Sequence, residues 1–124
     1  GLNPLIIDAH SFPDFPIPPE TTPIENRPDI CIGTDTFHTP QPLIQVAVEA
    51  FETEGFSVMV DVPFKGTITP MKYYRREKRV RSIMIELNRK IYLGYGSDKL
   101  ENFSSIKNQT RAALLKIARA AESC

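Results

Sequence analysis

The chain has 124 residues, of which 41% are hydrophobic and 24% charged, and its formal net charge at pH 7 is zero. This length suits one domain with a single core, and the composition is that of an ordinary globular protein. No apolar run approaches the roughly 18 residues that cross a membrane, and no basic-then-apolar signal segment opens the chain. We therefore expect one domain over residues 1–124, no membrane partner and a cytoplasmic location.

The first part of the chain predicts two short strands separated by irregular chain. Leu5–Ala9 and Asp29–Gly33 are apolar runs of strand length. Between them, Phe12–Pro28 carries six of the eleven prolines. Proline fixes φ and removes a backbone donor, so this segment should be irregular.

A helix should follow the second strand. Thr39 and Pro40 have the residue types of an N-cap and a first helical position, and Gly55 is placed as a C-terminal cap. The apolar residues between them repeat at helical spacing: Leu43, Val46, Ala47, Ala50 and Phe51.

The second half predicts two more strands and a final helix. Phe56–Val62 is β-branched, and Ser82–Leu87 carries isoleucine or leucine at every second position. The helix begins between Asp98 and Ser105, and its expected buried stripe is Ile106, Thr110, Ala113, Leu114, Ile117 and Ala121. Apolar strands alternating with helices indicate an α/β fold with a central sheet covered by helices.

Charge is unevenly distributed along the chain. Residues 1–61 hold ten acids and one basic residue, Arg27, whereas residues 62–124 hold fourteen basic residues and five acids. The densest run, Lys72–Arg81, has two tyrosines beside its charges, a composition that nucleic-acid sites also use. A solvated loop that balances the acidic half is the favoured reading, so we expect no nucleic-acid partner.

Two residues stand out against this background. His10 is predicted just past the carboxyl end of the first strand, where ligands gather in open α/β sheets. Glu86 is a carboxylate inside an otherwise apolar strand, so it must be neutral, paired or facing a site. A metal-bound water with a carboxylate base would use such a pair, and a hydrogen-bonded structural histidine is the alternative.

Four motifs give a resemblance to a known family. "DAHSFP", "CIGTDTFHTP", "VPFKGTIT" and "SIMIELNRKIYL" occur in that order between Leu5 and Leu93. Their order and spacing resemble the carboxyl-terminal half of the N-formylglutamate amidohydrolases. The resemblance implies a three-layer α/β/α architecture with a mixed central sheet, similar to zinc carboxypeptidases and of the phosphorylase/hydrolase type, present here in part.

The resemblance also assigns roles to the matching positions. It implies that His10 is a zinc ligand, with Asp8 orienting its imidazole. Glu86 corresponds to the carboxylate that activates the metal-bound water and returns the proton to the leaving amine.

The remaining matched positions would border the substrate, an N-acyl amino acid. Lys65 and Gly66 belong to a loop beside the site, and the lysine could hold a substrate carboxylate or the oxyanion. Arg89 is a candidate carboxylate partner. His38 either lines the site or is a structural loop histidine.

The chain departs from the family pattern in three respects. Members are longer, and their amino-terminal half supplies the other metal ligands. Asp61 replaces the usual asparagine, and a single glycine, Gly66, stands where two are common. We expect a zinc-dependent amidohydrolase that is completed by a missing amino-terminal half or a partner chain, with little zinc held by this chain alone. The alternative is a non-catalytic homologue that binds a small molecule or a protein.

Overall fold

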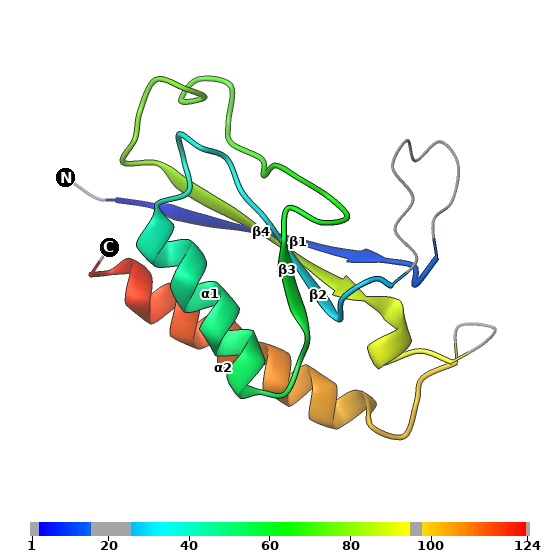
Figure 1. Cartoon of the computed structure of the whole chain (residues 1–124). Coiled ribbons are helices and arrows are strands. Elements are labelled where there is room, and N and C mark those ends of the chain that lie inside the picture. The colour runs from blue at the N-terminus through cyan, green and yellow to red at the C-terminus, as the bar shows by residue number, and fades with distance from the viewer. Residues whose placement is uncertain (1–2, 16–25, 95–97, 124) are drawn as a thin grey trace.

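The computed structural model describes residues 3–15, 26–94 and 98–123. Its elements follow the predicted order: β1 (Leu5–Phe12), β2 (Ile30–Gly33), α1 (Gln41–Thr53), β3 (Val58–Val60), β4 (Arg81–Asn88), the 3₁₀ turn η1 (Arg89–Ile91) and α2 (Phe103–Ala121). Figure 1 shows the two helices packed side by side beneath the sheet.

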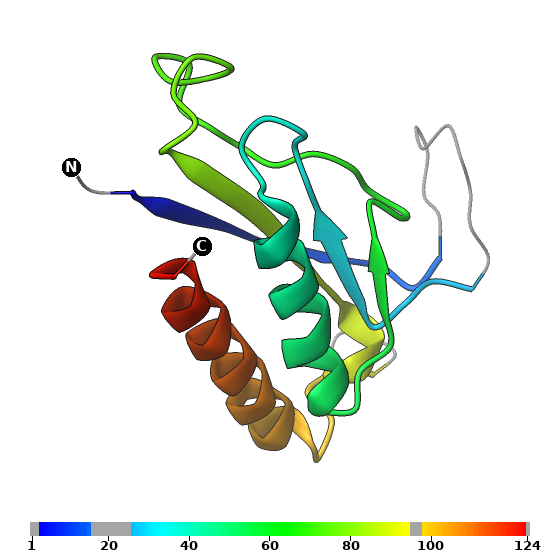
Figure 2. The ribbon, with the colours of Figure 1, turned by 60° about the vertical axis from the view of Figure 1, so that its left-hand side comes forward.

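The four strands form one mixed sheet in the order β1-β4-β2-β3. β1 runs parallel to β4, β4 antiparallel to β2, and β2 parallel to β3. The predicted α/β fold with a mixed sheet is therefore confirmed. In the part of the chain that the structure describes, both helices cover the same face of the sheet (Figures 1 and 2), which gives one sheet layer and one helix layer.

The core lies between this face and the helices. Ile83 and Ile85 of β4 are fully or almost fully buried against Leu43 and Phe51 of α1 and Ile117 of α2. These side chains belong to one apolar cluster, and Leu87 packs against it. Because side chains alternate across a strand, the intervening residues of β4 project to the opposite face.

Helix α1 differs from the prediction at its start and agrees at its end. Pro40, not Thr39, is the N-cap, because the Thr39 hydroxyl donates to the Ser82 carbonyl instead of capping the helix. At the other end Gly55 has φ +91°, which glycine adopts readily. Gly55 N–H donates to the Glu52 carbonyl and Phe56 N–H to the Phe51 carbonyl, the two bonds of a Schellman cap.

Two strands also end at positions that differ from the prediction. β1 continues three residues beyond Ala9, because its register with β4 is maintained until Phe12 faces Asn88 and Phe12 is buried. β3 is shorter than predicted: it pairs with β2 over three residues, and Asp61 then takes φ +59°. Extended pairing cannot continue through that left-handed conformation.

Helix α2 begins within the predicted window, at Phe103. Ala113, Ile117 and Ala121 of the predicted stripe are fully buried, whereas Ile106, Thr110 and Leu114 are partly buried. Among the described residues, no helix combines the length and apolar character needed to cross a membrane. Most of the proline-rich segment, residues 16–25, lies outside the described residues.

Candidate functional site

The strand register places His10 and Glu86 in one row across the sheet. His10 of β1 pairs with Glu86 of β4, and Glu86 pairs in turn with Cys31 of β2. All three side chains project to the face opposite the helices, because Ile7, Ile85 and Ile32, which occupy the alternate positions of the same strands, belong to the helix side. His10 therefore lies within β1 and not past its end; the prediction of its place was wrong because pairing extends β1 to Phe12.

His10 is held by Asp8, two residues earlier on the same face of β1. The imidazole Nε2 lies 2.7 Å from Asp8 Oδ1, and the side chain of His10 is 48% exposed. A carboxylate accepts hydrogen bonds, so Nε2–H is the donor, and in the neutral ring Nδ1 is the lone-pair nitrogen. This is the arrangement by which a carboxylate orients a metal-binding histidine.

Glu86 is the buried member of the row. The residue is 7% exposed, and within the described residues its Oε2 atom has no hydrogen-bond partner. Burial raises the pKa of the Glu86 carboxyl above its usual range, while His10 acts in the opposite direction and Asp8 adds to the rise. A raised carboxyl pKa is what a group that accepts and returns a proton near neutral pH requires.

Arg27 is the residue beside this row that sequence reasoning did not select. Its guanidinium lies 5.4 Å from the ring centre of Phe64 and 5.9 Å from that of Phe12, and Nη1 donates to the Pro13 carbonyl. Its charge opposes the rise in the pKa of Glu86. The sequence feature that could have pointed to Arg27 is its position as the single basic residue among the first 61. An isolated cation in an acidic region has many carboxylates as possible partners.

The loop after β3 covers the middle of the same face. Cys31 Sγ donates to the Phe64 carbonyl at 3.3 Å, and a Cβ atom on Gly33 would overlap the Gly66 carbonyl oxygen. Asp61 fixes the start of this loop by accepting hydrogen bonds from both the N–H and the hydroxyl of Thr34, at 2.8 and 2.7 Å. Asparagine, the usual residue of the family at this position, also tolerates the left-handed conformation of Asp61. The aspartate is therefore compatible with the same backbone.

The other predicted site residues differ in their placement. Lys65 lies in this loop with an exposed side chain, and Gly66 has φ +95°. Arg89 is exposed in η1, and the arginine whose charge acts on Glu86 is Arg27. The structure therefore does not bring Arg89 to Glu86.

His38 is fully buried and has both ring nitrogens engaged. Nδ1 lies 2.8 Å from the Val80 carbonyl, and Nε2 accepts the Arg75 N–H at 2.8 Å, which fixes a neutral ring protonated at Nδ1. The ring also stacks with Tyr74. This geometry supports the structural alternative for His38 and leaves no ring nitrogen for a substrate.

His38 contacts the basic run at two residues: its Nε2 accepts the Arg75 N–H, and its ring stacks with Tyr74. The cations of the run from Lys72 to Arg79 are exposed, whereas Arg81 is buried and donates to the Ala121 and Asn3 carbonyls. Within the run, Arg79 contacts Glu77 at 2.8 Å and lowers the pKa of that carboxyl to about 2. One of the arginines is therefore part of the fold and another is neutralised locally.

Among the described residues, the clustered metal-binding side chains are fewer than a catalytic zinc site requires. A catalytic zinc site uses three protein ligands, and the described residues contain no group of three His, Cys, Asp or Glu side chains that could hold a metal. His10 fits as one oriented ligand, but the described residues do not fit a complete zinc site.

The arrangement of sheet and helices is shared with a solved amidohydrolase. The crystal structure of N-formylglutamate amidohydrolase from Ralstonia eutropha JMP134 matches this chain with a TM-score of 0.65 and 24% sequence identity, over 94% of this chain and 42% of that chain. This likeness defines the fold as that of an amidohydrolase, and the chain spans less than half of the solved protein.

The family assignment rests on the sequence. The family model for N-formylglutamate amidohydrolase matches residues 2–93, so the chain belongs to the N-formylglutamate amidohydrolase family. That range contains β1 to β4 and η1 and ends before α2. No curated protein matches the sequence.

Proposed function

We propose that this chain takes part in hydrolysing the amide bond of an N-acyl amino acid of the N-formylglutamate type. Glu86 serves as general base and His10 as one ligand of a zinc ion. The observation that carries the proposal is the register pairing of a partly exposed, carboxylate-oriented histidine with a buried glutamate of raised pKa. Membership of the amidohydrolase family supports the reaction class.

Each residue has a defined task in this proposal. Asp8 holds the imidazole of His10 through Nε2, so that Nδ1 is the nitrogen left to act as a ligand. The Glu86 carboxylate takes a proton from the attacking water and delivers it to the departing amine nitrogen, so that a carboxylic acid and an amine result. A bound zinc ion would supply a Lewis acid at the carbonyl, and its further ligands lie outside the described residues.

Lys65 is the proposed contact for the carboxylate of the substrate. It is exposed, lies in the loop that crosses the same face, and is adjacent to Phe64, whose carbonyl accepts from Cys31 in the central row. An ammonium group there favours an anionic substrate such as an N-acyl amino acid.

The test uses the natural polypeptide that carries this chain. N-formyl-L-glutamate hydrolysis is followed by formate release in the presence of zinc, for the wild type and for Glu86→Gln. We expect hydrolysis by the wild type and its loss in the variant, with the zinc content unchanged. A folded wild type that holds zinc and releases no formate would contradict the proposal.

A second candidate is a non-catalytic member of the family that binds a small molecule or a protein. It is favoured by the lack of a three-ligand metal group among the described residues. The same assay separates the two candidates, because a binding domain would interact with N-formyl-L-glutamate without releasing formate.

A further inference from the structure

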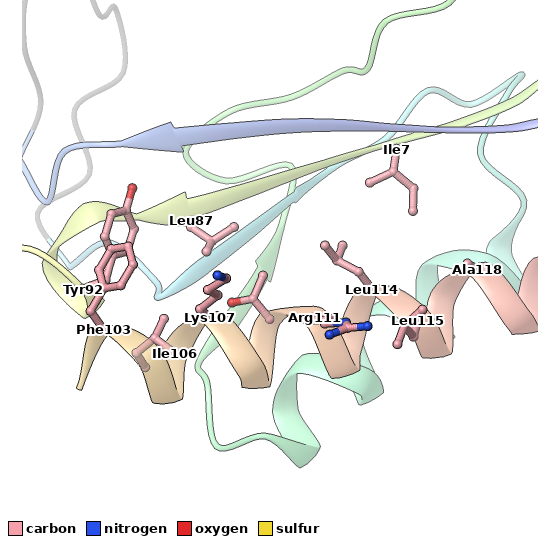
Figure 3. Close-up of a pocket in the computed structure, with 11 residues that line it drawn as sticks. Ile7, Leu87, Tyr92, Phe103, Ile106, Lys107, Arg111, Leu114, Leu115 and Ala118 are labelled. Atoms are coloured by element: carbon pink, nitrogen blue, oxygen red, sulfur yellow. The ribbon is translucent and has the colours of Figure 1, made fainter.

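An apolar groove runs along α2 on the side of the molecule where β1 forms the edge of the sheet. Its volume is about 580 Å³. Figure 3 shows Ile7 and Leu87 pointing from the sheet toward Leu114 of α2, with Ile106 further along the groove. Leu115, also on its wall, is 44% exposed. Apolar side chains therefore line a concave surface that is open to solvent.

The groove lies where the helix layer stops. α1 packs against α2 and contacts β2 and β3, so the two helices cover the β2–β3 side of the sheet and its centre. β1 pairs with β4 alone among the described strands, which leaves its other edge without a backbone partner in that part of the chain. Within the described residues, an eight-residue edge strand therefore borders an apolar groove.

The charge along α2 is of one sign. Between Phe103 and Ala121 the helix carries four basic residues and no acid. Two of them, Lys107 and Arg111, line the groove, and neither makes an ion pair within the described part of the chain. A neighbouring element would meet apolar side chains flanked by two cations.

From these features we infer that the groove is the docking surface for an amphipathic helix with an apolar stripe and flanking acidic side chains. The helix belongs to a polypeptide that extends the sheet beyond β1. The apolar stripe covers Ile7, Leu114 and Leu115, and the acids face Lys107 and Arg111. The chain spans 42% of the length of the similar solved amidohydrolase, so more than half of that protein lies outside the match and is long enough to include such an element.

This inference does not depend on the catalytic proposal, because none of the groove residues belongs to the His10–Glu86 row. If the inference holds, a strand added at the edge of β1 runs beside His10. Side chains of that strand would then be within reach of the imidazole, because neighbouring strands lie roughly 4.8 Å apart.

The test uses two synthetic stapled helices of about 20 residues, long enough to stay helical. Both carry leucines along one face; one has glutamates beside the leucines and its twin has lysines there. Each is titrated at low salt into the isotope-labelled chain, and binding is read from NMR shifts. The charge-reversed variant K107E/R111E is compared with a matched control, K116E/R119E, whose residues lie on α2 outside the groove.

We expect the glutamate helix to bind at least about fivefold more tightly than its twin. Its shifts should map to Ile7, Leu114 and Leu115. In K107E/R111E the preference should reverse, whereas in the control it should remain. Equal binding of the two helices, or shifts that map outside the groove, would overturn the inference. Dimerisation of the chain that buries the groove and is lost in Leu115→Glu would also overturn it, because the occupant would then be a second copy.

Discussion

Glu86 and His10 are register partners on adjacent parallel strands, and both project to the face that the helices leave uncovered. The glutamate is buried, whereas the histidine is about half exposed. Burial opposes ionisation of Glu86, whereas the electrostatic interactions with His10 and Arg27 favour it. The pair therefore combines a carboxyl whose ionisation is disfavoured by burial with an imidazole that solvent or a ligand can reach.

The first prediction concerns the pH dependence of stability. The pKa of Glu86 in the folded chain lies above its ordinary value of 4.5. Its contribution to stability is therefore fully present below that value and is lost as pH rises through the folded pKa. Glu86→Gln stays neutral and lacks this loss. The difference in unfolding free energy between variant and wild type should shift in favour of the variant as pH rises, as measured by urea denaturation.

Glu52→Gln is the matched control, since it makes the same substitution at an exposed position of α1. A large loss of stability in Glu86→Gln would instead indicate a structural role for Glu86. If Glu86→Gln loses roughly 3 kcal/mol or more at neutral pH, the carboxylate is a structural partner of a buried cation and not a proton carrier.

A second prediction concerns metal binding by the 124-residue chain alone. The described residues supply one oriented histidine and no three-ligand group, so zinc should bind weakly and be removed by dialysis. The chain has two histidines, which makes the measurement specific. In an NMR titration with zinc, the His10 ring signals should move and those of buried His38 should not, and His10→Ala should remove the response. Stoichiometric zinc retained after dialysis would show that the site is complete in this chain.

A third prediction concerns the thiol in the central row. Burial is the largest cause of the rise in the pKa of Cys31 from 9.0 to about 11. In a chain with Cys124→Ser, Cys31 is the remaining thiol. Its reaction with a thiol reagent at neutral pH should be at least about a hundredfold slower than that of a free thiol, because the thiolate is the reactive form. Urea should restore the ordinary rate. A fast reaction in the folded chain would mean that the loop carrying Phe64 opens readily.

The order of the elements and the buried face of each could be predicted because both follow from local patterns. Isoleucine and leucine alternate along β4, and the apolar residues of α1 recur at helical spacing. The end of β1 could not be predicted. The sequence "HSF" is polar at two of three positions, and what extends the strand is pairing with β4 and burial of Phe12, both of which depend on distant residues.

The same limit applies to the candidate site. His10 and Glu86 could be selected because each breaks an apolar pattern, but only the register shows that they are neighbours. Arg27 was missed because its contacts, with Phe12 and Phe64, come from segments far apart in sequence. His38 remained ambiguous because its role depends on Val80 and Arg75, about forty residues away.

A fourth prediction follows from the placement of His38. Replacing it with alanine removes the partners of the Val80 carbonyl and the Arg75 N–H and leaves a cavity beneath Tyr74. Unsatisfied buried groups and cavities each cost free energy, so His38→Ala should destabilise the chain by about 3 kcal/mol. Urea denaturation measures this loss, and hydrogen exchange at Arg75 should accelerate. Thr36→Ala, at an exposed position of the same loop, is the control. A loss no larger than that of the control would show that the two hydrogen bonds contribute little.

The last prediction tests how the loop that crosses the site face is seated on the sheet. A Cβ atom at Gly33 would overlap the Gly66 carbonyl and the Met84 side chain, whereas one at Gly55 would meet open space and strain only the backbone at φ +91°. Gly33→Ala should therefore destabilise the chain by about 2 kcal/mol or more, and Gly55→Ala by about 1 kcal/mol. Adding Met84→Ala to Gly33→Ala should not restore stability, because a backbone oxygen still occupies the space. Thermal unfolding of the variants provides the comparison. If Gly33→Ala is as stable as the wild type, the loop is not packed on β2 as described, and the proposed substrate contact of Lys65 lacks an anchored loop.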